Sequence, residues 1–224
     1  EVGGNVTDYL PVQEVRDLIR YADDIYLKFG APDKVFGKSD KFAEQVSYEA
    51  HKHNIKLIPC PVRHMGTEYS FEVLREMYRY LSSREGFEFR EYTKADTIEI
   101  ENGRAVGVWL IGRDGERRLE KARYIVAAPG RGGAEWLTSI ARANSLQTIN
   151  NAVDIGVRVE VPNAVMDHLT KNLYEAKLVY YSDTFENKVR TFCMNPGGIV
   201  SEEHYEGGVG GKGIAVVNGH SYAD

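Results

Sequence analysis

Two histidines occupy positions where an imidazole ring could take part in chemistry. His64 lies in the short segment Pro61-Val-Arg-His-Met-Gly66, and His220 follows the apolar run at residues 214–217. Functional side chains often collect in loops, and histidine transfers protons near neutral pH. Both are therefore candidate acid–base residues if the fold brings them to one cleft. The alternative for each is a surface histidine that bonds a backbone carbonyl.

A cysteine and three arginines extend the set of candidate residues. Cys193 ends an apolar run and follows Arg190 closely, and a nearby cation favours the reactive thiolate. Cys193 is thus a candidate catalytic thiol, although many such cysteines are small core residues. Arg63, Arg158 and Arg190 could each bind an anionic substrate group. For Arg158 the alternative is a solvated side chain, or one paired with a neighbour such as Glu160.

A glycine-rich turn forms a candidate anion site. Gly130-Arg131-Gly132-Gly133 follows the apolar run at 124–128 and precedes an expected helix at 134–143. Backbone N–H groups at a helix N-terminus attract phosphate. The residues alone are equally consistent with a phosphate-facing turn and with a simple strand-to-helix connection. The one G-x-G-x-x-G match, at 208–213, precedes an apolar run typical of a strand, which predicts a connector rather than a dinucleotide site.

Composition excludes several classes of function. The 224 residues carry a net charge of −5, which argues against nucleic acid or an anionic membrane as partner, and no apolar run is long enough to span a bilayer. The sequence contains no G-x-S-x-G, H-E-x-x-H or C-x-x-C motif, and His51 and His53 would diverge on a helix, so we expect no metal site. Two cysteines and an N-terminus unlike a signal peptide predict free thiols and a cytoplasmic protein. The expected partner is a small-molecule substrate, with the oligomeric state left open.

Periodicity predicts a mixed α/β fold with a largely antiparallel sheet and flanking helices. Asn102-Gly103 is a strong signal for a tight turn between two strands. Gly30 and Pro32 should end the first helix, and Ser70 should cap the third. The expected helices are at 11–29, 39–53, 70–81, 134–143 and 164–172. The expected strands are at 55–58, 87–92, 97–100, 105–111, 124–128, 153–161, 176–181, 188–193 and 213–217.

Several longer strings carry a resemblance to a known family. NGRAVGV (102–108) and ARYIVAAPG (122–130) are similar to the β-meander and final strand of FAD-binding domains of the glutathione-reductase type. The strings KLIPCPVRHMGT (56–67), VDIGVRVEVP (153–162) and VRTFCMNPGG (189–198) extend the resemblance, as do YADDIYLKFGAPD (21–33) and VNGHSYAD (217–224). Together they resemble the uncharacterised bacterial FAD-dependent dehydrogenases of the NAD(P)/FAD-dependent oxidoreductase superfamily.

The resemblance implies that this chain corresponds to the middle, substrate-domain segment of such a flavoprotein. Members of the family begin with a strand–GxGxxG–helix unit that is absent here, so FAD is expected in the intact protein and not in this segment alone. Residues 86–133 would be the meander and final strand of the FAD domain, and residues 1–85 and 145–224 the substrate-side layer. FAD would approach Ala95, Ala128, Gly130, Arg131 and Gly132.

The expected reaction in the intact protein is hydride transfer through FAD. The flavin carries the hydride, and the protein supplies acid–base groups and orients the substrate. His64, His220 and Cys193 would be catalytic, and Arg63, Arg158 and Arg190 would bind the substrate. Two alternatives remain open. One is a stand-alone binding module without catalysis, and the other is a transferase or hydrolase that acts through Cys193.

Overall fold

The structure is a computed structural model that describes residues 4–38, 40–150, 154–205 and 214–220. The chain divides into two compact units, which are described separately. Unit 1 comprises residues 1–84, 158–202 and 217–224, and unit 2 comprises residues 85–157 and 203–216. The glycine-rich stretch at 207–213 lies outside the described residues.

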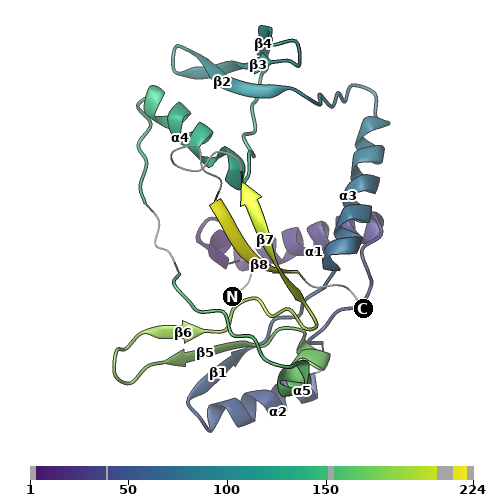
Figure 1. Cartoon of the computed structure of the whole chain (residues 1–224), viewed down its shortest axis with the longest axis vertical. Helices are drawn as coiled ribbons and strands as arrows, with labels where there is room; N and C mark the ends of the chain where they lie inside the picture. Colours follow the sequence, from purple (N-terminus) through teal and green to yellow (C-terminus); the bar gives the residue numbers. More distant parts are fainter. Residues whose placement is uncertain (1–3, 39, 151–153, 206–213, 221–224) are drawn as a thin grey trace. The chain divides into compact units, whose positions relative to one another are not determined.

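Unit 1 contains four α-helices and a small sheet (Figure 1). Pro11 precedes α1, a position that suits proline because its missing N–H is not needed there, and Gly30 follows α1 with φ +100°. The third helix begins at Gly66 rather than at Ser70, whose hydroxyl instead donates to the Gly66 carbonyl within the helix. The helices are α1 (Val12–Lys28), α2 (Asp40–His51), α3 (Gly66–Ser82) and α5 (Asn163–Leu173).

The sheet of unit 1 has the order β1-β5-β6 and is antiparallel throughout. Strand β1 (Ile55–Ile58) pairs with β5 (Lys177–Tyr181), which pairs with β6 (Lys188–Arg190). The core beside it is formed by Leu57, Leu173 and Ala176, against which the α2 residues Phe42, Ala43 and Val46 pack. The apolar face of α2 therefore covers β1, and this packing fixes the segment that leads from β1 toward His64.

Unit 2 is built on a three-stranded antiparallel meander, β2 (Lys94–Glu101), β3 (Arg104–Ile111) and β4 (Arg117–Lys121). Asn102 and Gly103 join β2 to β3 with φ of 50° and 74°, the left-handed pair that a two-residue hairpin requires, which confirms the predicted turn. The short 3-10 helix η2 (Arg131–Gly133) leads into α4 (Ala134–Ala143).

The remaining elements are a 3-10 helix and a two-stranded sheet. The 3-10 helix η1 (Gly4–Asp8) begins the described chain, and β7 (Ile199–Tyr205) and β8 (Ile214–His220) form the sheet.

The described part is therefore a mixed α/β structure with five α-helices and small antiparallel sheets, as the periodicity predicts. Three expected strands are wrong, however: residues 87–92, 124–128 and 154–161 form no strand, and residues 151–153 lie outside the described part. Their apolar side chains are exposed, Val126 at 90% and Ile155 at 95%. The physical reason is that a strand needs a partner backbone, and none pairs with these segments in the described structure.

None of the helices that the structure describes is both long and apolar enough to cross a bilayer.

Candidate functional site

His64 lies where three segments of unit 1 meet. The Phe36 N–H donates to the Val62 carbonyl at 2.8 Å, and the Val62 N–H donates back to Phe36 at 3.1 Å. The Gly37 N–H donates to the Asn172 carbonyl at 2.9 Å, which ties in the end of α5. Backbone hydrogen bonds thus hold the loop that carries His64 against the Phe36 segment, which is itself bonded to the end of α5.

Tyr174 supplies the aromatic surface against which His64 lies. It follows α5 with φ 59° and ψ −63°, and the Glu175 N–H donates to the Leu173 carbonyl at 2.7 Å. These values describe a classic γ-turn, a rare and strained conformation for a residue other than glycine. Tyr174 is nevertheless almost fully buried, so the turn directs its ring inward, against His64 and Phe36.

The imidazole of His64 stacks on the ring of Tyr174. Their centroids are 4.0 Å apart at an interplanar angle of 20°, and the Tyr174 hydroxyl oxygen lies 3.1 Å from His64 Nε2. In a stack this oxygen lies above the imidazole plane, whereas the lone pair of a ring nitrogen points within the plane. We therefore regard the contact mainly as ring stacking. Phe36 also contacts Tyr174, at 5.3 Å between ring centroids and an interplanar angle of 55°.

Arg63 points to protein groups instead of toward an open surface. Its Nε and Nη2 donate to the two carboxylate oxygens of Asp23 at 2.7 and 2.9 Å, and its Nη1 donates to the Pro32 carbonyl at 2.8 Å. The Arg63 hydrogen bonds lower the pKa of Asp23, and the same pair raises the pKa of Arg63. This fork ties α1 to the loop of His64, so Arg63 acts structurally here, and its substrate role stays a prediction.

The other candidates for the substrate face have varied surroundings. Arg190 lies in β6, with its guanidinium carbon 4.9 Å from the centre of the Phe192 ring. Cys193 is an exposed free thiol and not a core residue, and Arg158 is exposed on a segment without regular structure. His220 is the last residue of β8, and its side chain lies outside the described part.

One hydrogen bond within unit 2 links the strand that carries Ala95 to the helix that follows the glycine turn. The Trp136 indole N–H, in the first turn of α4, donates to the Asp96 carbonyl at 2.7 Å, next to Ala95 in β2. The contact joins the β2 segment to the helix that directly follows the glycine turn, more than thirty residues later in sequence. Ala128 lies in the exposed segment before that turn, and the side chain of Arg131 lies outside the described part.

The geometry of the glycine turn explains its composition. Gly130 has φ +64°, and a Cβ on Gly133 would lie 2.3 Å from the Pro129 Cβ, so a larger residue would force the turn apart. A Cβ on Gly132, in contrast, would have open space around it. No side chain caps the N-terminus of α4, which continues directly from the 3-10 helix η2.

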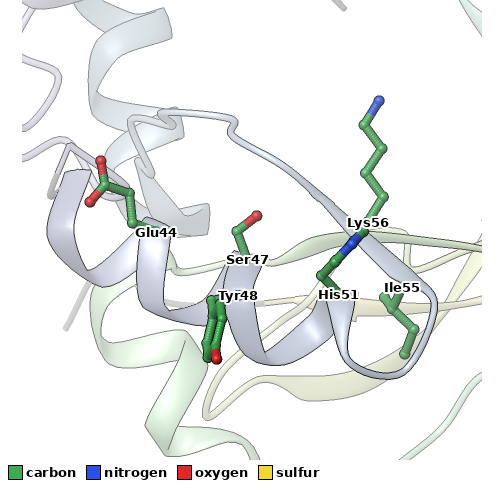
Figure 2. Close-up of a pocket in the computed structure, with 6 residues that line it drawn as sticks. All are labelled: Glu44, Ser47, Tyr48, His51, Ile55 and Lys56. Carbon is green, nitrogen blue, oxygen red and sulfur yellow. The ribbon is translucent and has the colours of Figure 1, made fainter.

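A shallow hollow of about 360 Å³ lies at the C-terminal half of α2 and the start of β1. Figure 2 shows that its side chains diverge: Tyr48 and Lys56 point to opposite sides of the helix. A substrate site needs a few polar groups that converge on one point. The hollow therefore lacks the arrangement expected of an active site, and its lining residues are Glu44, Ser47, Tyr48, His51, Ile55 and Lys56.

Sequence reasoning missed Tyr174, Asp23 and Trp136, which position the predicted residues. Asp23 lies within one of the strings that carry the resemblance, so that string contained a signal for it. Tyr174 had no such signal, because the left-handed backbone it adopts is usual for glycine. Among the described residues, no group of three or more histidine, cysteine, aspartate or glutamate side chains could hold a metal ion.

Compared with protein-family models, with curated proteins and with solved structures, the chain matches none.

Proposed function

We propose that this chain is the substrate-domain segment of an FAD-dependent oxidoreductase, in which unit 2 contributes to the adenosine side of the flavin site. The observation that carries the proposal is the Trp136–Asp96 hydrogen bond. It joins Asp96, the residue after Ala95, to the third residue of the helix that follows the turn at 130–133. The family resemblance assigns both Ala95 and this turn to FAD.

The residues of the turn suit a phosphate-bearing ligand. Gly130 and Gly132 have open space where a Cβ would be, so a ligand can approach the backbone closely. The N-terminus of α4 has no side-chain cap, and it presents the positive end of the helix dipole next to the turn. These features supply one part of a flavin site, and the GxGxxG unit for the pyrophosphate would come from elsewhere in the intact protein.

The exposed apolar segments support the same interpretation. Residues 124–128 and 153–161 have the composition of strands, yet Val126, Ile155 and Val157 are almost completely exposed. Contiguous exposed apolar surface marks an interface in most proteins. In an FAD domain the strand that ends at such a glycine turn joins the central sheet, and that sheet would bury residues 124–128.

FAD would supply the hydride transfer in the intact protein, while the chain supplies acid–base groups and orientation. His64 is the best-placed candidate, because its half-buried ring is held by Tyr174 on a loop that two backbone hydrogen bonds join to Phe36. His220, Cys193, Arg158 and Arg190 complete the proposed substrate face.

The test is flavin content in the full-length protein that contains this segment. We expect the purified protein to carry FAD, recognised by the visible absorption of the flavin. Gly132→Asp should lower the affinity for FAD, because a carboxylate at an open position of the turn would repel a phosphate. Gly132→Ala fits the same space without a charge and should keep the affinity. A full-length protein that binds no FAD, or a G132D variant that binds it normally, would overturn the proposal.

A stand-alone interaction module is the second candidate, favoured by the exposed apolar side chains of residues 154–161. Such a module would dock a partner through this surface and would have no need of flavin. The flavin measurement therefore separates the two candidates directly.

A further inference from the structure

Strand β2, the first strand of the meander, departs from regular pairing at Asp96. Ala95 lies opposite Leu110 and Thr97 opposite Trp109, so Asp96 has no partner residue on β3. One extra residue on one strand is a β-bulge, a feature that frees backbone groups and often lies next to functional sites. The carbonyl that the bulge releases is the one that accepts the Trp136 indole N–H.

The bulge is also fixed through its side chain. The Arg117 Nε, in β4, donates to Asp96 at 2.8 Å. The guanidinium of Arg117 lies 4.0 Å from the ring centre of Trp109, whose own indole N–H donates to Glu99. Arg117 of β4, whose guanidinium lies against Trp109 of β3, therefore bonds to the side chain of the same residue whose carbonyl accepts the Trp136 N–H.

The position of Trp136 determines what this bond controls. It is the third residue of α4, immediately after the turn at 130–133, where the Gly133 N–H donates to the Gly130 carbonyl at 3.3 Å. No side-chain cap holds the start of α4. The indole bond therefore ties the glycine turn to the bulge of β2.

The geometry points to Trp136 as a positioning residue that sets the distance between the β2 bulge and the phosphate-facing turn, and so selects FAD over flavins that lack an adenosine group. This inference rests on the proposed function, because it assigns both segments to the same cofactor. Trp136 would act through the backbone of the turn and would not contact the reacting atoms of the flavin. Its contribution is confined to the adenosine half, which FMN does not possess.

The experiment measures the affinities for FAD and for FMN of the full-length protein after removal of its flavin. Trp136→Phe keeps the aromatic bulk and loses the N–H donor. We expect its preference for FAD over FMN to fall about fivefold, which is the loss of one hydrogen bond of about 1 kcal/mol. Thr138→Val is the control on the same helix, because it removes a hydroxyl that donates to the Ala134 carbonyl within α4, and it should leave the preference unchanged.

The ratio of the two affinities is measured on a single preparation, so partial unfolding of a variant lowers both affinities and cancels. A fivefold fall in W136F alone supports the inference. An unchanged ratio, or an equal loss of both affinities, overturns it while the proposed function stands. A wild-type protein that binds no FAD instead overturns the proposed function itself.

Discussion

The ion pair between Asp23 and Arg63 should stabilise the cluster of loops around His64 more than any exposed ion pair of the same helix does. The change that tests it is Asp23→Asn, which keeps the shape of the side chain and removes its charge. Arg63 would then keep the Pro32 carbonyl as a partner but lose both charge-assisted hydrogen bonds to the carboxylate.

The expected magnitude follows from the burial of the two partners. The Arg63 side chain is 13% exposed and that of Asp23 40%, so the pair lies between an exposed pair and a fully buried one. Exposed pairs contribute about 0.2–1 kcal/mol, and breaking a buried pair costs about 3–5 kcal/mol. We therefore expect a loss of about 2 kcal/mol, which is roughly a 30-fold rise in the opening equilibrium of the cluster.

Amide hydrogen exchange measures the local opening of the loops around His64. The Phe36 and Val62 amides bond to each other's carbonyls inside the cluster, so their exchange reports the stability of this part and not of the whole chain. The effect should also depend on pH. Because Arg63 lowers the pKa of Asp23, the stabilisation is present above the ordinary value of 3.8 and is lost as the pH falls through the lowered value.

Asp17→Asn is the control on the same helix, since Asp17 pairs with Arg20 at 2.9 Å on an open surface where both side chains are more than half exposed. It should change the exchange of Phe36 and Val62 very little. If D23N accelerates their exchange no more than D17N does, the pair does not support the loop of His64 and the reasoning from burial fails.

Three further expectations follow from the exposure and spacing of single side chains. Gly133→Ala should destabilise unit 2 by roughly 1–3 kcal/mol because its Cβ would overlap Pro129, whereas Gly132→Ala should be neutral; thermal unfolding followed by tryptophan fluorescence separates the two. Val157→Asp should reduce aggregation of the isolated chain, seen by light scattering, without lowering its melting temperature, and a lowered melting temperature would show that Val157 is packed. Both thiols should react with a disulfide reagent in the native protein and Cys193→Ser should leave one; a Cys193 that reacts only after denaturation would also remove the transferase alternative.

The parts of the fold that local chemistry determines could be predicted from the sequence. Asn102-Gly103 permits the left-handed pair of a tight hairpin, and the apolar spacing of residues 15–29 predicts the helix that the structure has as α1. Strand β4, in contrast, is Arg117-Arg-Leu-Glu-Lys121, which has no apolar alternation. Its pairing with β3 defines it, and pairing between segments is not visible in a short window of sequence.

The candidate site shows the same division. The loop between two turn signals singles out His64 and Arg63 as candidates, but it contains no information about the residues that they contact. Asp23 is one of several charged residues on α1, and only the fold shows that it is the one facing Arg63. Trp136 reads as an ordinary apolar position of α4, since its function in the structure depends on a β-bulge about forty residues earlier.

The strain at Tyr174 does not by itself require a catalytic explanation. A strained backbone conformation costs of the order of 1–3 kcal/mol. Burial of a large aromatic side chain, together with ring contacts to His64 and Phe36 worth about 0.5–1.5 kcal/mol each, offsets such a cost. Packing therefore accounts for the γ-turn, and the case for chemistry at His64 depends on its half-exposed ring and fixed loop.

The exposed strand-like segments are different, because nothing in the described structure offsets them. Val126, Ile155, Val157 and Val159 are each at least three-quarters exposed. Burial of four such side chains would contribute roughly 6–12 kcal/mol, which approaches the whole stability of a typical domain. The local sequence of these segments favours strands, but the described structure gives them no strand to pair with. Such a conflict between local preference and tertiary structure is expected at functional sites, including sites where a further segment or protein would pair with them. Under the proposed function, pairing with a central FAD-type sheet would remove the conflict at residues 124–128.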